Sequence, residues 1–477
     1  MRPVLLLAAL PSLLIAQEAA TTLKDQKALA VTIYNDNLAL VKDTREVRLS
    51  KGEARLAFQE VSAQIRPETA SLRNLTAPRD FWVAEQNFDF DLLTPQKLLE
   101  KYVGERVTVV HSVPKADGPG EREIREEATV LATNSGTVLQ FADRIETSAP
   151  GRIIFPKVPA NLRARPTLVI SLHSGAEKAQ QLELSYLTGG LSWRADYVAN
   201  LAPDEKTLDL SGWVTLTNQS GAAYPNATLQ LVAGDVNRAR QRPERAMAMT
   251  EMAMSMKATA APKMAEESLF EYHLYTLDRP TTLAVNQTKQ VALLSASAVP
   301  VRKDYLLQGQ SHYYSGSYGD LGDRQKVGVF IEFDNKETSR LGMPLPKGIL
   351  RVYKRDSEGR AQFVGEDSVD HTPKNERIRL KLGNAFDVTA RRKQTDYKSL
   401  GKQGKYGSGH ESAFQVEFKN AKKEAVTVSL LEPLPGDWEV LQESHPHTKA
   451  TADTAKFQVT VPAEGSATLT YRVRVRW

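Results

Sequence analysis

The sequence predicts a mainly β protein, with antiparallel β-sandwich domains, a small SH3-like or Sm-like β-barrel insert and little helix. Two observations lead to this fold class. Apolar and polar residues alternate with a period of two over many short segments, as they do in half-buried strands. Turn-forming glycine, aspartate and serine separate these segments at short spacing, which is typical of antiparallel sheets.

The first half of the chain predicts one short helix among strands. Thr94 can cap a helix, Pro95 suits its first position, and Gly104 ends it. Four closely spaced strands follow, which together with the helix predict the small barrel, and a further group of strands follows the barrel. The predicted strands are 106–111, 128–132, 137–141 and 152–155, and then 182–186, 196–201, 208–217 and 228–231.

The last third shows the clearest alternation. Apolar and cationic residues alternate over 377–382, and the same period recurs at 414–418, 426–430 and 457–461. Asp356 and Gly359 predict a hairpin turn between two strands, with glycine where a positive φ is needed. About eight such segments predict a C-terminal β-sandwich.

A length of 477 residues suggests about three domains. We expect the following division: 1–16 signal peptide; 28–93 N-terminal β region; 94–160 short helix plus small β-barrel; 161–237 central β domain; 238–267 Met/Ala-rich flexible loop; 268–326 β continuation of the central domain; 327–477 C-terminal β-sandwich.

The N-terminal residues predict export. Arg2 precedes an apolar stretch over 4–10 and 13–16, which has the length and flanks of a secretory signal peptide. The chain has no cysteine, which excludes disulfides, thiolate metal sites, a cysteine nucleophile and a lipoprotein anchor. The net charge of +5 is mild, and no cationic cluster indicates a nucleic-acid partner. We therefore expect a periplasmic or secreted protein with no transmembrane helix after signal-peptide removal.

Several longer runs resemble one bacterial family. They are 31–41 (VTIYNDNLALV), 186–197 (YLTGGLSWRADY), 234–238 (GDVNR), 365–367 (GED) with 370–373 (DHTP), and 385–388 (AFDV). Together they resemble the bacterial envelope family known as domain-of-unknown-function family 4139, which is related to mucoidy-inhibitor proteins. The resemblance covers nearly the whole mature chain and implies a β-rich, exported protein. It implies no catalytic residue. The long coiled coil of the mucoidy inhibitors has no counterpart here, so the resemblance does not extend to exopolysaccharide control.

Two motifs could bind metal. Thioethers at M-x-M spacing can bind Cu(I) in an exported protein, although a low-complexity loop is the favoured interpretation. The methionines concerned are Met247, Met249, Met252, Met254, Met256 and Met264. His445 and His447 flank a proline, which favours exposed turn histidines over a metal site.

Two clusters could carry other chemistry. The first could hold a general base, but its sequence favours a turn in which the acids cap backbone amides. It consists of Glu366, Asp367, Asp370 and His371. The second could bind sugar by ring stacking, but a core role for its aromatic residues is favoured. It consists of Trp193, Arg194, Asp196, Tyr197 and Trp213.

The C-terminal strand permits two interpretations. Its alternation and terminal aromatic residue resemble the last strand of an outer-membrane β-barrel. The other candidate strands are short and carry charged insertions, which favours a soluble sandwich. The residues concerned are Leu469, Tyr471, Val473, Val475 and Trp477.

These observations favour an exported cell-envelope protein that binds or scaffolds rather than catalyses. We assign no catalytic, cofactor-binding or metal-binding residue and no cofactor. The expected partner is an envelope protein or an anionic polysaccharide. Three alternatives remain: a glycan-directed hydrolase, which would require paired carboxylates such as Asp196 and Asp235 to converge, an outer-membrane β-barrel component, and a Met-rich copper-binding protein.

Overall fold

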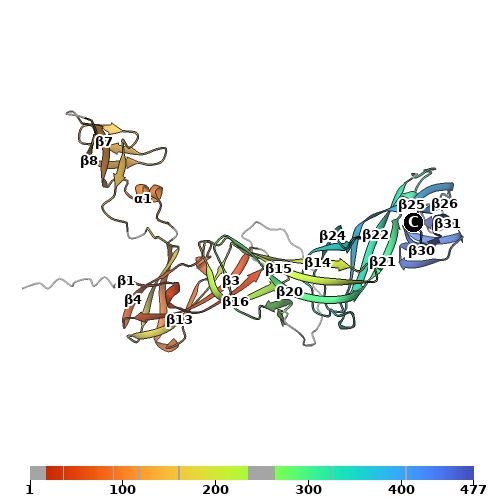
Figure 1. Ribbon diagram of the computed structural model, residues 1–477, viewed down its shortest axis with the longest axis horizontal. Helices are drawn as coiled ribbons and strands as arrows, with labels where there is room; N and C mark the ends of the chain where they lie inside the picture. Colours follow the sequence, from red (N-terminus) through yellow and green to blue (C-terminus); the bar gives the residue numbers. More distant parts are fainter. Residues whose placement is uncertain are drawn as a thin grey trace, which may run out of the picture. The chain divides into compact units, whose positions relative to one another are not determined.

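The chain is a mainly β protein in two compact units. The computed structural model describes residues 18–35, 37–89, 91–115, 119–159, 162–234, 264–322, 324–402 and 406–477. Among these residues there is one α-helix, so the predicted fold class of a mainly β protein with little helix is confirmed (Figure 1). Unit 1 comprises Met1–Trp193, Leu216–Val232 and Arg279–Lys289, and unit 2 comprises Arg194–Thr215, Ala233–Asp278 and Gln290–Trp477. No helix of the described ranges is long and apolar enough to cross a membrane.

Unit 1 contains two sheets of long strands. The first has the order β1 (Glu18–Thr21), β4 (Gly52–Gln59), β12 (Thr167–Ser174) and β6 (Phe81–Asp89). The strands of the second sheet that lie in unit 1 have the order β16 (Tyr224–Ala233), β2 (Gln26–Tyr34), β3 (Leu38–Leu49), β13 (Lys178–Thr188) and β5 (Ser71–Asn74), with β19 (Thr281–Leu283) also paired to β16. Apolar residues alternate inward along these strands, as the sequence pattern requires.

The small domain predicted over 94–160 lies in unit 1 and is an open sheet. Helix α1 (Pro95–Lys101) begins where predicted, because the Thr94 hydroxyl accepts a hydrogen bond from the Lys97 amide at 3.1 Å. The strands have the order β10 (Ile145–Glu146), β9 (Val138–Gln140), β8 (Glu121–Ala132), β7 (Arg106–Pro114) and β11 (Arg152–Ile154). A barrel closes only when its edge strands pair, and in the described ranges the edges β10 and β11 are two and three residues long. The small SH3-like or Sm-like barrel predicted over 94–160 is therefore a five-stranded sheet that does not close in the described ranges.

Unit 2 contains a five-stranded sheet and the β17–β18 hairpin. The sheet has the order β20 (Gln287–Pro300), β15 (Thr207–Asn218), β14 (Leu191–Leu201), β23 (Gly348–Arg355) and β24 (Ala361–Val369). The predicted hairpin turn joins β23 to β24, and Gly359 has φ 79° there. The hairpin consists of β17 (Ala265–Leu269) and β18 (Tyr272–Thr276).

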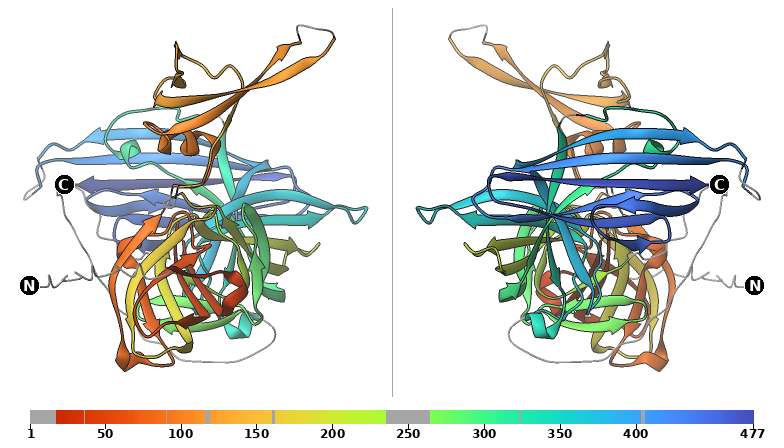
Figure 2. Two further views of the ribbon diagram at one scale, coloured as in Figure 1. Left: turned by 90° about the vertical axis from the view of Figure 1, so that its left-hand side faces the viewer. Right: turned by 90° about the vertical axis from the view of Figure 1, so that its right-hand side faces the viewer.

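The C-terminal strands of unit 2 fold over one core. Their order is β28 (Asp437–Glu443), β31 (Gly465–Arg476), β26 (Gly409–Asn420), β25 (Arg377–Ser399), β22 (Gln325–Asp334), β21 (Arg302–Gln308), β27 (Val426–Pro433), β30 (Thr454–Val461) and β29 (His447–Thr451). Figures 1 and 2 show β25, β26 and β31 side by side, as their pairing requires. The two ends of the sheet face each other, because the Trp438 indole of β28 donates to the Ala452 carbonyl at 2.8 Å. This arrangement is sandwich-like, as predicted.

Short 3₁₀ helices connect some of these strands. They are η1 (Leu23–Asp25), η2 (Pro67–Thr69), η3 (Pro78–Asp80), η4 (Ser311–Tyr314) and η5 (Glu337–Ser339).

Each unit encloses a fully buried arginine. In unit 1, Arg45 forms two hydrogen bonds to Asp43, at 3.0 and 2.8 Å, and its guanidinium lies 3.9 Å from the ring centre of Phe58. Its third nitrogen donates to the carbonyls of Thr21 and Gln59, at 3.0 and 2.9 Å. Arg45 of β3 therefore joins β1 and β4 through their backbones.

The second buried arginine lies in the C-terminal sandwich. Nη1 of Arg392 lies 2.7 Å from Oε1 and 2.9 Å from Oε2 of Glu432, and both side chains have no solvent exposure. The Tyr314 hydroxyl donates to Glu432 at 2.6 Å and lies 3.3 Å from the Tyr471 hydroxyl. Burial and the nearby carboxylate raise the pKa of Tyr314 well above its ordinary value, so this tyrosine keeps its proton.

Candidate functional site

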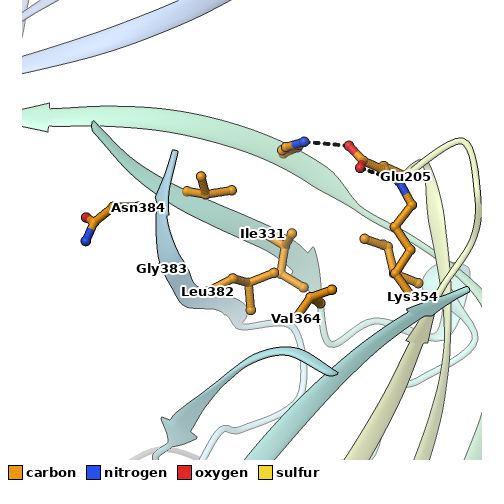
Figure 3. A pocket seen from close by; sticks show the side chains of 10 residues that line it. Glu205, Ile331, Lys354, Val364, Leu382, Gly383 and Asn384 are labelled. Atoms are coloured by element: carbon orange, nitrogen blue, oxygen red, sulfur yellow. Dashed lines mark hydrogen bonds and ion pairs between the residues drawn. The ribbon is translucent and has the colours of Figure 1, made fainter. Parts of the chain in front are cut away.

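A cavity of about 180 Å³ lies between the two sheets of unit 2 (Figure 3). We call it the Glu205 pocket. The five-stranded sheet and its loops contribute Leu201, Glu205, Lys354 and Val364. The C-terminal sheet contributes Lys303, Val329, Ile331, Leu382, Gly383 and Asn384.

Glu205 holds two lysines at one edge of this pocket. Its carboxylate lies 2.6 Å from Nζ of Lys303, which is on β21, and 2.6 Å from Nζ of Lys354, which is on β23 (Figure 3). The glutamate is in the turn between β14 and β15 with φ 60°, a left-handed conformation in which glycine or asparagine is usual. Residues held in sparsely populated backbone conformations cluster at functional sites.

The carboxylate stays ionised near neutral pH. Burial alone would raise the pKa of Glu205, but the hydrogen bonds from Lys303 and Lys354 outweigh it and hold that pKa below its ordinary value. Burial would lower the pKa of Lys303, and the contact with Glu205 raises it above its ordinary value. Two ammonium groups facing one carboxylate leave the pocket edge with a net charge of +1.

The floor of the pocket is apolar. Ile331 and Leu201 are 1% and 7% exposed, whereas Val364 at the rim is 37% exposed. Figure 3 shows Ile331, Leu382 and Val364 close together, with the Asn384 side chain directed away from them. The backbones of β24 and β25 approach closely here, since a Cβ on Gly365 would lie 2.4 Å from the Leu382 carbonyl oxygen. Glycine at position 365 therefore keeps the two sheets together beside the pocket.

The lining of the pocket combines apolar side chains with two lysines and one carboxylate. Its lining residues carry no serine, cysteine or histidine, and its one carboxylate is engaged by two lysines. A cavity of roughly 150 Å³ with an apolar lining is large enough to hold a benzene ring. The pocket of about 180 Å³ therefore suits one aromatic or branched aliphatic side chain, with the lysines beside it suited to an anion.

A second cavity of about 200 Å³ also lies in unit 2. Its lining includes Glu271, His273 and His371. Nδ1 of His273 lies 2.8 Å from Glu266, and Nδ1 of His371 accepts a hydrogen bond from the Lys347 amide at 3.3 Å. No group of three histidine, aspartate or glutamate residues suited to a metal ion occurs in the part of the chain that the structure describes.

The two predicted metal motifs are described only in part by the structure. Residues 247–256, which hold five of the methionines, lie outside the described residues, and Met264 is 4% exposed. His447 lies 2.7 Å from Glu443, and its ring is close to Trp438. The His445 ring lies instead 3.0 Å from the Ser444 hydroxyl.

The predicted acidic cluster is divided between a strand and the turn after it. Glu366 and Asp367 belong to β24, which ends at Val369, so the turn begins later than the sequence suggested. Glu366 lies 3.1 Å from Arg351, and Asp367 accepts a hydrogen bond from the Lys381 amide at 2.8 Å. These contacts join β24 to its neighbours β23 and β25.

The aromatic residues of the predicted sugar-binding cluster are mostly buried. Trp193 and Tyr197 are 5% and 1% exposed, and Trp213 is 40% exposed. The Tyr197 hydroxyl donates to the Pro346 carbonyl at 2.7 Å, and burial raises its pKa above the ordinary range.

Asp196 is 7% exposed and is held by neighbouring side chains. It accepts hydrogen bonds from Thr215, Arg194 and Arg351 at 2.7, 3.2 and 3.1 Å. Burial would raise the pKa of Asp196, but these donors lower it below its ordinary value. Asp235, the predicted second carboxylate of a hydrolase, lies outside the described residues.

The C-terminal strand contributes to the sandwich core. Leu469, Tyr471, Val473 and Val475 of β31 are each at most 2% exposed, and Trp477 is 44% exposed. The buried residues of β31 are thus the apolar residues that alternate with polar ones in the sequence.

Comparison with known proteins identifies one family. A family model described as domain of unknown function (DUF4139) matches residues 182–477, which include every residue that lines the Glu205 pocket. The resemblance predicted over nearly the whole mature chain is therefore confirmed for the latter part of the chain. A comparison with curated proteins finds no significant match.

Proposed function

Because the chain belongs to the family of the domain of unknown function DUF4139, whose name states no activity, we propose that it acts by binding a protein of the cell envelope at the Glu205 pocket. The observation that carries this proposal is the combination of an apolar cavity with two lysines that share one carboxylate. Such a combination suits non-catalytic recognition of a partner.

The partner feature that fits the pocket is an apolar side chain next to a carboxylate. Burying one apolar side chain contributes about 1.5–3 kcal/mol, which makes the cavity an anchor point rather than a whole interface. A partner carboxylate could accept hydrogen bonds from Lys303 and Lys354 without displacing Glu205, because each ammonium group has three donors.

Export is the second part of this proposal. The apolar stretch that follows Arg2 supports it, since its length and flanks are those of a secretory signal peptide. The absence of cysteine is compatible with an oxidising compartment. Mass spectrometry of the N-terminal peptide of the protein recovered from its host tests the cleavage, and a chain that retained Met1 would contradict it.

Site-directed photocrosslinking in the native envelope tests the binding site. A photoreactive residue at Val364, which is 37% exposed at the pocket rim, should capture a defined envelope protein. The crosslinked peptide of that protein should contain an apolar residue flanked by an acid. The same residue at Phe386, which is 95% exposed on β25, is the matched control position.

Charge reversal of the two lysines makes the test specific. Lys303→Glu with Lys354→Glu places three carboxylates at the pocket edge and should reduce capture at Val364 at least tenfold, with no change at Phe386. Capture that is equal at both positions, or that survives the charge reversal, would refute the proposal.

A further inference from the structure

The tip of the β17–β18 hairpin exposes two apolar side chains. Leu269 ends β17 and is 43% exposed, and Phe270 follows it with 84% exposure. The described ring contact of Phe270 is with Tyr272, at 6.4 Å between ring centres. Aromatic side chains are enriched at protein–protein interfaces relative to the rest of the surface.

The conformation of Phe270 is unfavourable as well as exposed. Leu269 pairs with Tyr272, so the connection is a two-residue turn of Phe270 and Glu271. Phe270 has φ 58°, a conformation in which glycine is strongly preferred at the first position of such a turn. The chain therefore holds a large apolar ring in solvent at a position where glycine would be more stable, which indicates that the ring has a use outside its own chain.

The hairpin that carries the tip is itself acidic. Residues 264–276 include Glu266, Glu267 and Glu271 and contain no lysine or arginine. This charge disfavours an anionic lipid surface as the occupant. It favours a partner site with an apolar cavity and cationic groups at its edge.

The Glu205 pocket of another molecule meets both requirements. It has the volume for one aromatic ring, and Lys303 and Lys354 give its edge a net positive charge. We propose that Phe270 of one copy of this chain inserts into the Glu205 pocket of a second copy, with Glu267 and Glu271 facing the lysines. This inference rests on the proposed function and names its partner. Since the two surfaces differ, the contact is heterologous and can continue from copy to copy.

Mixed-isotope crosslinking of the purified protein tests this contact. One population carries Phe270→benzoylphenylalanine, and the other is ¹⁵N-labelled and unmodified. Irradiation of the mixture should join the 270 peptide to ¹⁵N-labelled peptides of β22 or β25, which line the pocket. The same photoreactive residue at Phe386 is the control and should give no such product.

Sedimentation velocity provides the second readout. Self-association should weaken at least tenfold in Phe270→Gly, which removes the ring while suiting the turn, and should weaken similarly in Lys303→Glu with Lys354→Glu. Absence of intermolecular products from position 270, with the same sedimentation for Phe270→Gly and the unmodified protein, would overturn the inference. If the probe at Val364 still captured another envelope protein, the proposed function would stand and only the contact between copies would be wrong. If that probe captured nothing, the proposed function and the contact between copies would both be wrong.

Discussion

Glu432→Gln should destabilise the C-terminal sandwich by about 3–5 kcal/mol. The substitution preserves size and removes the charge that faces Arg392, whose side chain has no solvent exposure. A buried charge that loses its partner costs about this amount, because the desolvation penalty of the guanidinium is then uncompensated. The Tyr314 hydroxyl can still donate to the glutamine carbonyl, so the loss reports mainly on the ion pair.

Replacing both charged residues should destabilise the sandwich much less than Glu432→Gln does. Arg392→Met with Glu432→Leu removes both desolvation penalties, and well-packed apolar replacements of buried pairs are often neutral. Among the described residues, Nε and Nη2 of Arg392 have no hydrogen-bond partner, so little is lost with them. The Tyr314 hydroxyl then loses its carboxylate acceptor and keeps only the 3.3 Å contact with the Tyr471 hydroxyl, which leaves a residual cost of about 1–3 kcal/mol. Adding Tyr314→Phe removes the hydroxyl that has lost its acceptor and should recover most of this remaining stability loss.

Hydrogen exchange measured on peptides of β26 and β31 is the appropriate assay. The protein has two compact units, so a single melting temperature would not isolate this sheet. A loss of less than about 1 kcal/mol in Glu432→Gln, or a double variant less stable than Glu432→Gln, would contradict a stabilising role of the Glu432 charge opposite Arg392.

Three further outcomes follow from other contacts. Gly309→Ala should cost about 1–3 kcal/mol, measured by the same exchange experiment, because the added Cβ would lie 2.1 Å from a Glu432 oxygen. Asp43→Asn should lower the stability of β3 and β4, measured by hydrogen exchange of their peptides, by about 3 kcal/mol, because it leaves the Arg45 guanidinium without its counter-charge. Unchanged exchange of these peptides would contradict this. Glu205 has a lowered pKa when folded, so its contribution is complete above its ordinary pKa of 4.5 and is lost as the pH falls through the folded value. Urea titrations from pH 7 to pH 2 should therefore show the difference between the protein and Glu205→Gln shrinking only in acid, and a constant difference would count against the ion pairs.

Local features of the fold could be predicted from the sequence. The alternation over 377–382 lies in β25, and the runs at 414–418 and 426–430 lie in β26 and β27. Thr94 caps the helix as its sequence suggested. These predictions succeed because strand period and helix capping depend on residues close in the sequence.

The Glu205 pocket could not be predicted in the same way. Lys303 and Lys354 are 98 and 149 residues from Glu205, so their meeting depends on which strands pair and in which register. The left-handed conformation of Glu205 is the one local feature that marks the site, and it belongs to the backbone. The glutamate residue type does not predict it, so it could not be read from the sequence.

The buried arginines could have been found. Val388, Ala390, Arg392 and Gln394 follow one another with period two, and all four side chains face inward. An arginine on the apolar phase of a strand predicts a buried counter-charge even where its partner is unknown. Arg45 lies on the inward phase of β3 in the same manner.

The parallel pairing of β14 with β23 affects how the protein folds. Ala195 is opposite Gly348, so one edge of β14 has no partner until more than 150 further residues have been synthesised. β2 and β16 present the same situation, with a side-chain hydrogen bond between Thr32 and Gln230 that spans 198 residues. Pairing at such separation is slow, and an open strand edge can pair with another chain in the meantime. The yield of refolding should therefore fall steeply as protein concentration rises, and a chaperone that covers strand edges should restore it.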